Sequence, residues 1–151
     1  MCNVLSDALQ TTQETIVTSA SWLIRNLSFD KNAKNCFLAW NNVVDMIFTT
    51  APSSSDNNDL MVGVYLTTAL LSIVYNNQRA RSRFGTPIFL TRLQHIQETW
   101  TAYTPSCPTT YQQRDYILLT LSRLLHLVIS PPQDVHLTNR SSRLRIKQTP
   151  C

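Results

Sequence analysis

The densest group of side chains that could do chemistry in this sequence is a run of arginines in its second half. Arg79, Arg81 and Arg83 alternate along one short segment, and Arg92 follows shortly after. Guanidinium groups at this density can bind carboxylates or phosphates through paired hydrogen bonds. The cluster therefore predicts a surface that faces an anion, either an acidic partner segment or a nucleic-acid backbone. A short helix whose arginines are simply solvated is the alternative, and the sequence leaves both interpretations open.

Nucleic acid and an anionic membrane are weaker candidates for that anion. Proteins that bind single-stranded nucleic acid interleave basic side chains with aromatic ones on which bases stack, and the run from Arg79 to Arg83 contains no aromatic residue. From Arg140 to Lys147, basic and apolar residues alternate, but one such cluster without a lipid anchor binds membranes weakly. The sequence therefore favours other proteins as partners.

The residues that usually carry catalysis or hold metals lie far apart in this sequence. His95, His126 and His136 have no acid or cysteine at ligand or triad spacing, although spacing leaves spatial neighbours open. The four cysteines include no C-x-x-C pair, which argues against a zinc site and a disulfide framework. With 2 glycines, the chain has no glycine-rich phosphate loop, dinucleotide fingerprint or nucleophile elbow. We therefore expect no enzymatic activity, no metal and no cofactor.

The elements that position these residues are expected to form a cytoplasmic, helical unit. The chain has 151 residues, of which 43% are apolar, enough for a sizeable core. Its charge is uneven, because residues 1–78 hold three bases and six acids whereas residues 79–151 hold ten bases and three acids. No signal peptide opens the chain, and its most leucine-rich stretch is interrupted by Arg123 and His126. The sequence therefore predicts no transmembrane segment.

Apolar residues recur at helical spacing and predict an all-α fold. Residues 1–13 read as the remnant of a preceding helix, 51–59 as a polar loop and 131–151 as a disordered basic tail. In the helix expected over 14–27, Trp22 widens the apolar stripe formed by Ile16, Ala20, Leu23, Ile24 and Leu27, and Asp30 is placed to cap the next helix. Further helices are expected at about 31–37, 43–48, 60–75, 79–84, 88–103 and 109–130.

Two segments of the sequence can be overlaid, which indicates an internal repeat. The unit is one long, one short and one long helix in about 40 residues, which is the period of armadillo and HEAT solenoids. Between its second and third helices we expect Gly85 to adopt a left-handed conformation, which costs glycine nothing. The matched pairs are Ala20 with Ala69, Trp22 with Leu71 and Ile24 with Ile73 at an offset of 49, and Ala33 with Ala80, Lys34 with Arg81 and Phe37 with Phe84 at an offset of 47.

The sequence of both units resembles the armadillo family. Residues 20–29, ASWLIRNLSF, followed by Asn32-Ala33-Lys34, are similar to the consensus run that closes one armadillo helix and opens the next. Residues 69–81, ALLSIVYNNQRAR, resemble the last repeat of the rotatin family of centriolar and basal-body proteins, and a Thr86-Pro87 turn follows as in that family. The resemblance covers about residues 15–130 and departs at Leu71, at Ser72 and in the basic tail after Pro132.

The resemblance implies an armadillo/HEAT-like right-handed α-solenoid with repeats at 14–50 and 60–103 and a capping helix at 109–130. Such an array has no N-terminal cap and is shorter than the usual minimum of about three repeats, so we expect a C-terminal piece of a larger solenoid or a short isoform. The family implies a non-enzymatic scaffold for centriole assembly and elongation and for ciliary basal bodies, located there and bound to centriolar proteins. A generic armadillo adaptor that binds an acidic partner segment is the alternative.

The resemblance also implies a groove, because the third helices of armadillo repeats line a concave surface. Polar residues opposite the apolar stripe are then the candidate partner contacts: Asp45 in the first unit, and His95 and Glu98 in the second. Ordinary exposed helix surface is the competing interpretation of the same residues. With Arg79, Arg81, Arg83 and Arg92, these residues form the predicted partner-binding set.

Overall fold

The computed structural model describes residues 2–39 and 57–130, and every regular element within them is an α-helix. This confirms the prediction of an all-α fold. The helices are α1 (Cys2–Gln10), α2 (Glu14–Leu27), α3 (Lys31–Ala39), α5 (Asn57–Val74), α6 (Gln78–Phe84), α7 (Pro87–Ala102) and α8 (Pro108–Ile129).

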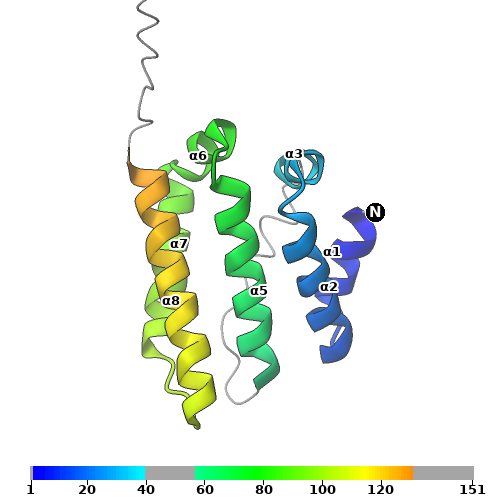
Figure 1. The fold of residues 1–151 in the computed structure, drawn as a ribbon, viewed down its shortest axis with the longest axis vertical. Helices are drawn as coiled ribbons and strands as arrows, with labels where there is room; N and C mark the ends of the chain where they lie inside the picture. Colours follow the sequence, from blue (N-terminus) through cyan, green and yellow to red (C-terminus); the bar gives the residue numbers. More distant parts are fainter. Residues whose placement is uncertain (1, 40–56, 131–151) are drawn as a thin grey trace, which may run out of the picture.

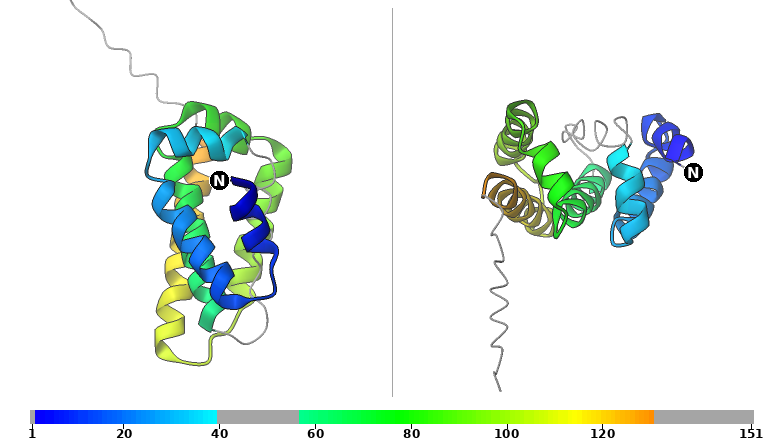
Figure 2. Two further views of the ribbon diagram at one scale, coloured as in Figure 1. Left: turned by 90° about the vertical axis from the view of Figure 1, so that its right-hand side faces the viewer. Right: turned by 90° about the horizontal axis from the view of Figure 1, so that it is seen from above.

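A row of three helices forms the body of the molecule. Helices α2, α5 and α8 lie side by side in one row, with α5 between the other two (Figure 1). The short helices α3 and α6 cross near the upper ends of α2 and α5 in that view. At the two ends of the row, α1 packs against α2 and α7 packs against α8 (Figure 2). Helix α5 therefore contributes most of the central core, because it is covered on both sides.

Local sequence signals set several of the helix ends. The Asp30 carboxylate accepts hydrogen bonds from the backbone N–H groups of Asn32 and Ala33, at 2.9 and 2.8 Å, and so caps α3 as expected. The Asn77 side chain caps α6 in the same way by accepting from the Ala80 N–H at 3.1 Å. Pro87 occupies the first turn of α7, where its missing N–H costs nothing.

Most residues that the sequence overlay pairs are buried alike, although Trp22 is exposed where Leu71 is half-buried. Ala20 and Ala69 are both buried, and Ile24 and Ile73 are both inaccessible to solvent. In the short helices, Phe37 and Phe84 are likewise matched in the core, as are Ala33 and Ala80. Asp30 and Asn77, which cap the two short helices, are separated by the same 47 residues. The two segments therefore repeat one local design of cap, small residue and large core residue.

Helix α8 repeats the buried positions of α5 at an offset of 51 residues. Leu66, Leu70 and Ile73 of α5 correspond to Ile117, Leu121 and Leu124 of α8, and all six are fully buried. The small residue Ala69 corresponds to Thr120, which is also buried. Helix α8 packs most extensively on α5 rather than on α7. It therefore occupies the same place relative to α5 that α5 occupies relative to α2.

The predicted left-handed conformation of Gly85 is wrong. Gly85 has φ −78° and ψ 0°, because its N–H continues the helical pattern by donating to the Arg81 carbonyl at 2.8 Å. The left-handed residue of the described chain is Asn76 (φ 52°), at the turn between α5 and α6. Asparagine tolerates this conformation better than most residues. The sharp turn therefore lies at Asn76, before α6, and not at Gly85, after α6.

Position 63 requires glycine because of the side chains packed against it, not because of its backbone conformation. A Cβ at Gly63 would lie 2.6 Å from Cζ2 of Trp100 and 2.9 Å from Cδ1 of Ile117. Both of those side chains are buried. The indole of α7 therefore lies directly on the backbone of α5, which only a glycine permits at this distance.

Several expected elements differ in extent or lie elsewhere. The first turn of α5, residues 57–59, is helical where a loop was expected over 51–59. The helix expected at 43–48, the remainder of that loop and the basic tail at 131–151 lie outside the described residues. Residues 2–10, expected to be part of a preceding helix, form the short helix α1, which packs on α2.

Candidate protein-interaction surfaces

The predicted arginine cluster is divided among different contacts. Nε of Arg81 donates to the carbonyl of Val74 at 3.5 Å, at the C-terminal end of α5. Nη1 of Arg83 donates to the carbonyl of Leu38, at the C-terminal end of α3. Both guanidinium groups therefore bind carbonyls in the last turn of a helix, and the Val74 carbonyl also accepts from the Asn77 N–H at 3.2 Å. Arg79 lies exposed at the start of α6.

Arg83 and Arg92 also converge on one aromatic ring. Their guanidinium carbons lie 5.9 and 5.8 Å from the centroid of Phe89, a distance at which cations are attracted to the ring. The Phe89 ring meets Phe84 edge to face, with centroids 5.4 Å apart. Arg83 and Phe84 of α6 therefore help to join α6 to α7 through Phe89, whereas the Arg92 contact lies within α7. The four arginines do not form one uniform patch.

The other predicted contact residues lie on α7 or outside the described residues. His95 and Glu98 are exposed on α7, three residues apart. Helix α7 packs against α8 and lies outside the row of long helices (Figure 2). Asp45 falls outside the described residues. The structure therefore places His95 and Glu98 together on one surface of α7. The side of the predicted groove that Asp45 would form lies outside the described residues.

An apolar surface that the sequence did not single out lies at the first end of the row. Between α1 and α2 there is a cavity of about 370 Å³, and the side chains that line it include Val4, Ala8, Ile16, Ser19 and Leu23. Ile16 and Leu23 remain 41% and 39% exposed, although both belong to the apolar stripe of α2. Only part of that stripe is therefore covered by the described chain.

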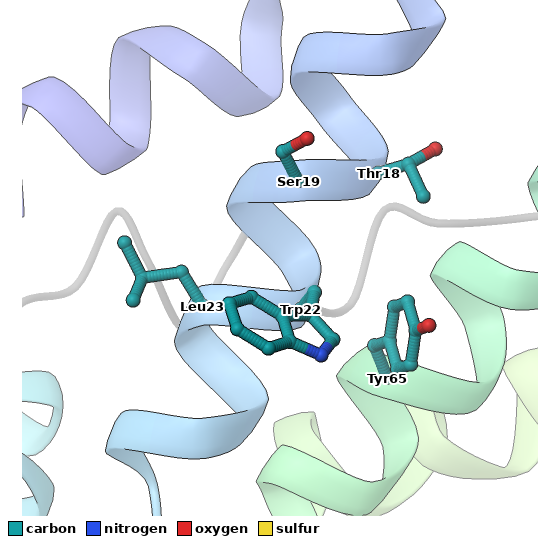
Figure 3. A pocket seen from close by; sticks show the side chains of 5 residues that line it. All are labelled: Thr18, Ser19, Trp22, Leu23 and Tyr65. Carbon is teal, nitrogen blue, oxygen red and sulfur yellow. The ribbon is translucent and has the colours of Figure 1, made fainter.

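A second cavity adjoins the first and reaches α5. It has a volume of about 460 Å³ and is lined by Thr18, Ser19, Trp22, Leu23 and Tyr65. Figure 3 shows the Trp22 indole between Leu23 and the Tyr65 ring, at the boundary of the two helices. Trp22 is 51% exposed, and no hydrogen-bond partner of the buried Thr18 hydroxyl lies among the described residues. We call Ile16, Ser19 and Leu23 the outer face of α2, because all three line the cavity beside α1; Ser19 and Leu23 also line the cavity that reaches α5.

The spacing of apolar residues could not reveal this outer face. A helical stripe shows which side of a helix avoids water, but not which neighbour covers it. The signal present in the sequence was the width of the stripe, because Trp22 and Leu23 extend it beyond Ala20 and Ile24. The tertiary structure covers Ala20 and Ile24 and leaves the wider part open.

A third cavity lies between α5 and α8. It has a volume of about 350 Å³ and is lined by Leu71, Tyr75, Arg123, His126 and Leu127. The side chains of Arg123 and His126 thus lie beside the apolar side chains of Leu71 and Leu127. Such a site suits an apolar side chain with a carboxylate next to it.

Cys107 has an unusual chemical environment at the start of α8. Its sulfur lies 3.2 Å from the Thr109 hydroxyl and 3.4 Å from the Thr110 hydroxyl. Hydrogen bonds from these two residues, Thr109 first, lower the pKa of the Cys107 thiol from 9.0 to about 7. A thiolate is therefore well populated near neutral pH, which makes this cysteine more reactive than an ordinary thiol.

Residues 2–39 and 57–130 contain no group of three or more His, Cys, Asp or Glu side chains able to hold a metal ion. Within the same ranges, no single helix has the length and apolarity to cross a bilayer, and α5 and α6 pass that test together only as a pair bent by 118°.

No protein-family model, curated protein or solved structure matches this chain.

Proposed function

We propose that this chain is a non-enzymatic protein-interaction scaffold of the armadillo/HEAT solenoid type. Its order of long and short helices and the matched burial at Ala20 and Ala69, and at Phe37 and Phe84, support a repeated unit. The observation that carries the proposal is that apolar side chains stay exposed at both ends of the row, Ile16, Trp22 and Leu23 on α2 and Leu119 and Ile129 on α8. Exposed apolar patches of this kind typically bind other proteins.

The resemblance of residues 69–81 to the rotatin family makes the proposal more specific. In that case the chain acts in centriole assembly and elongation and in the organisation of ciliary basal bodies, and its partners are centriolar proteins. The repeat at 60–103 includes the segment that carries the resemblance, and its core residues Ala69, Ile73 and Phe84 are fully buried. Within residues 69–81 themselves, Ala69, Ile73 and Ala80 are buried, whereas Tyr75 and Arg79 are exposed.

Localisation of the tagged full chain in ciliated cells tests the centriolar part. We expect the signal to coincide with a centriole marker and to persist at the basal body when cilia form. A diffuse distribution of chain that is soluble and folded by circular dichroism would refute the centriolar role. Proximity labelling from the same tag identifies the neighbouring proteins.

A generic adaptor for acidic partner segments is the second candidate, and the cavity between α5 and α8 favours it. Arg123 flanks the apolar floor of Leu71 and Leu127, so it can pair with a carboxylate beside a buried aliphatic group. We expect a labelled peptide of alternating glutamate and leucine to bind, and Arg123→Glu to weaken the binding. Lys31→Glu on α3 is the matched control, because Lys31 is also basic and exposed but lies on another helix. Equal binding to both variants would refute this function.

A further inference from the structure

We infer that the end of the molecule formed by α3, α6 and the last turns of α8 binds single-stranded nucleic acid. The inference goes beyond the proposed scaffold function. It rests on basic and aromatic side chains that the tertiary structure brings together from separate stretches of the sequence. We call these residues the basic-aromatic track: Arg25, Phe29, Tyr75, Arg79, Arg81 and Arg123.

Positive charge is concentrated at this end of the row. Helices α3 and α6 cross near the upper ends of α2 and α5, and α8 also ends there (Figure 1). Residues 25–39 and 75–84, which include both short helices, hold six bases and one acid. That acid, Asp30, accepts two backbone N–H groups as the cap of α3. The last two turns of α8 add Arg123 and no acid. A surface of this charge attracts polyanions.

An exposed aromatic ring lies in the turn before each short helix. Phe29 precedes α3 and is 58% exposed, and Tyr75 precedes α6 and is 57% exposed. The guanidinium carbon of Arg25 lies 5.4 Å from the centroid of the Phe29 ring. Nε of Arg81 donates at 3.5 Å to the carbonyl of Val74, the residue before Tyr75. An arginine therefore lies at each of the two turns that present a ring.

Contacts between the row helices bring the two turns and α8 together. The hydroxyl of Ser72 on α5 donates at 2.7 Å to the carbonyl of Ser28, the residue before Phe29. Tyr75 follows Ser72 by three residues, and it lines the cavity between α5 and α8 together with Arg123. The basic-aromatic track therefore crosses all three helices of the row, from α2 over α5 to α8.

The two rings decide between the polyanions that such a charge attracts. An acidic protein segment pairs its carboxylates with guanidinium groups and needs no exposed ring beside them. A single strand presents its phosphates to basic side chains and the flat faces of its bases to aromatic rings, so it uses both features of the track. A duplex keeps its bases stacked inside and would leave the rings of Phe29 and Tyr75 without a partner. A single strand is therefore the polyanion that fits.

The opposite end of α8 provides a comparison within the same chain. There the guanidinium carbon of Arg114 lies 5.2 Å from the centroid of the Tyr111 ring. Nη2 of Arg114 also pairs with the carboxylate of Asp115 at 2.9 Å. The positive charge beside this exposed ring is thus compensated by an acid, unlike the charge of the basic-aromatic track. Tyr111 is therefore the matched control for Tyr75.

Fluorescence anisotropy of a labelled oligothymidylate of about 12 nucleotides measures binding to the full chain. We expect saturable binding, and Tyr75→Leu should raise Kd about tenfold, because leucine keeps the apolar bulk and loses the ring on which a base stacks. Tyr111→Leu should leave Kd unchanged. Arg79→Gln should weaken binding and reduce the steepness of log K against log salt by about 0.7, the value of one phosphate contact with a single strand. Arg79 and both tyrosines are exposed, so these substitutions leave the core intact.

A strand of the same length that lacks its bases separates stacking from charge. It keeps the phosphates, so it should bind the unsubstituted chain about tenfold more weakly than oligothymidylate and bind Tyr75→Leu with that same reduced affinity. Ring resonances give a readout that does not depend on a variant. Addition of oligothymidylate to the unsubstituted chain should shift the ring resonances of Phe29 and Tyr75 and leave those of Tyr111 in place.

Four outcomes would overturn the inference. Three of them are equal affinity for the strands with and without bases, an unchanged Kd in Tyr75→Leu, and resonance shifts confined to residues 131–151. The fourth is displacement of the strand by the glutamate–leucine peptide at a lower concentration than unlabelled oligothymidylate requires, because an acidic protein segment would then be the better occupant of the track.

Discussion

Gly63→Ala is expected to destabilise the protein even though alanine is the better helix former. In an exposed helix interior this substitution would stabilise by about 1 kcal/mol. Here the new Cβ would lie 2.6 Å from Cζ2 of Trp100 and 2.9 Å from Cδ1 of Ile117, closer than van der Waals contact allows. Overpacking of this kind typically costs about 1–3 kcal/mol.

The surroundings of Trp100 place the cost near the upper end of that range. The indole is 1% exposed and meets the Tyr103 ring edge to face, with centroids 5.8 Å apart, so it has little room to swing away. After the gain in helix propensity, we expect a net loss of up to about 2 kcal/mol in the free energy of unfolding. For a chain of this size that corresponds to a fall in Tm of roughly 4–8 °C.

Urea unfolding followed by far-ultraviolet circular dichroism measures this loss, with an unchanged m value as the sign that the unfolded state is unaffected. Gly85→Ala is the control, because its Cβ would meet the Arg81 carbonyl oxygen at 3.0 Å and Val128 at 3.5 Å, with an ordinary φ. Its effect should stay below about 1 kcal/mol.

A double-mutant cycle with Trp100→Phe tests whether the indole is the cause. Phenylalanine lacks the distal ring atoms that the Gly63→Ala methyl would strike, so the double variant should lose about 0.5–3 kcal/mol less than the sum of the two single losses. The indole N–H has no hydrogen-bond partner among the described residues, so no such bond is lost. A Gly63→Ala variant as stable as the unsubstituted chain, or strict additivity in the cycle, would refute the packing explanation.

Two further outcomes follow from local chemistry. Because hydroxyl hydrogen bonds lower the pKa of Cys107 to about 7, its alkylation rate in the folded chain should rise through pH 7 and level off above about pH 8, as followed by mass spectrometry of its peptide. Thr109→Ala should move this midpoint upward, and an unchanged midpoint would exclude that hydroxyl as the main cause. Asp30→Ala and Asn77→Ala should each cost about 1 kcal/mol in urea unfolding, because each removes a helix N-cap, whereas a loss at only one of them would contradict their equivalence.

The periodicity of the sequence determined the helices and much of the core. Leu93, Ile96 and Trp100, at helical spacing, form the buried stripe of α7, and Leu121 and Leu124 lie in the buried stripe of α8. Asp30 fixed the start of α3 because a cap bonds to backbone groups only two and three residues away. These features depend on neighbours in the chain, which a single sequence contains in full.

The tertiary structure alone decided which side chains are left for a partner. The apolar stripe of α2 did not distinguish Ile24, which α5 helps to bury, from Leu23, which stays open. Nor could the spacing of the arginines show that Arg81 and Arg83 bind the carbonyl ends of other helices and that Arg79 stays exposed. The physical reason is that coverage, and pairings such as that of Arg83, depend on segments far apart in the sequence: Ser72 meets Ser28 across 44 residues, and Arg83 meets Leu38 across 45.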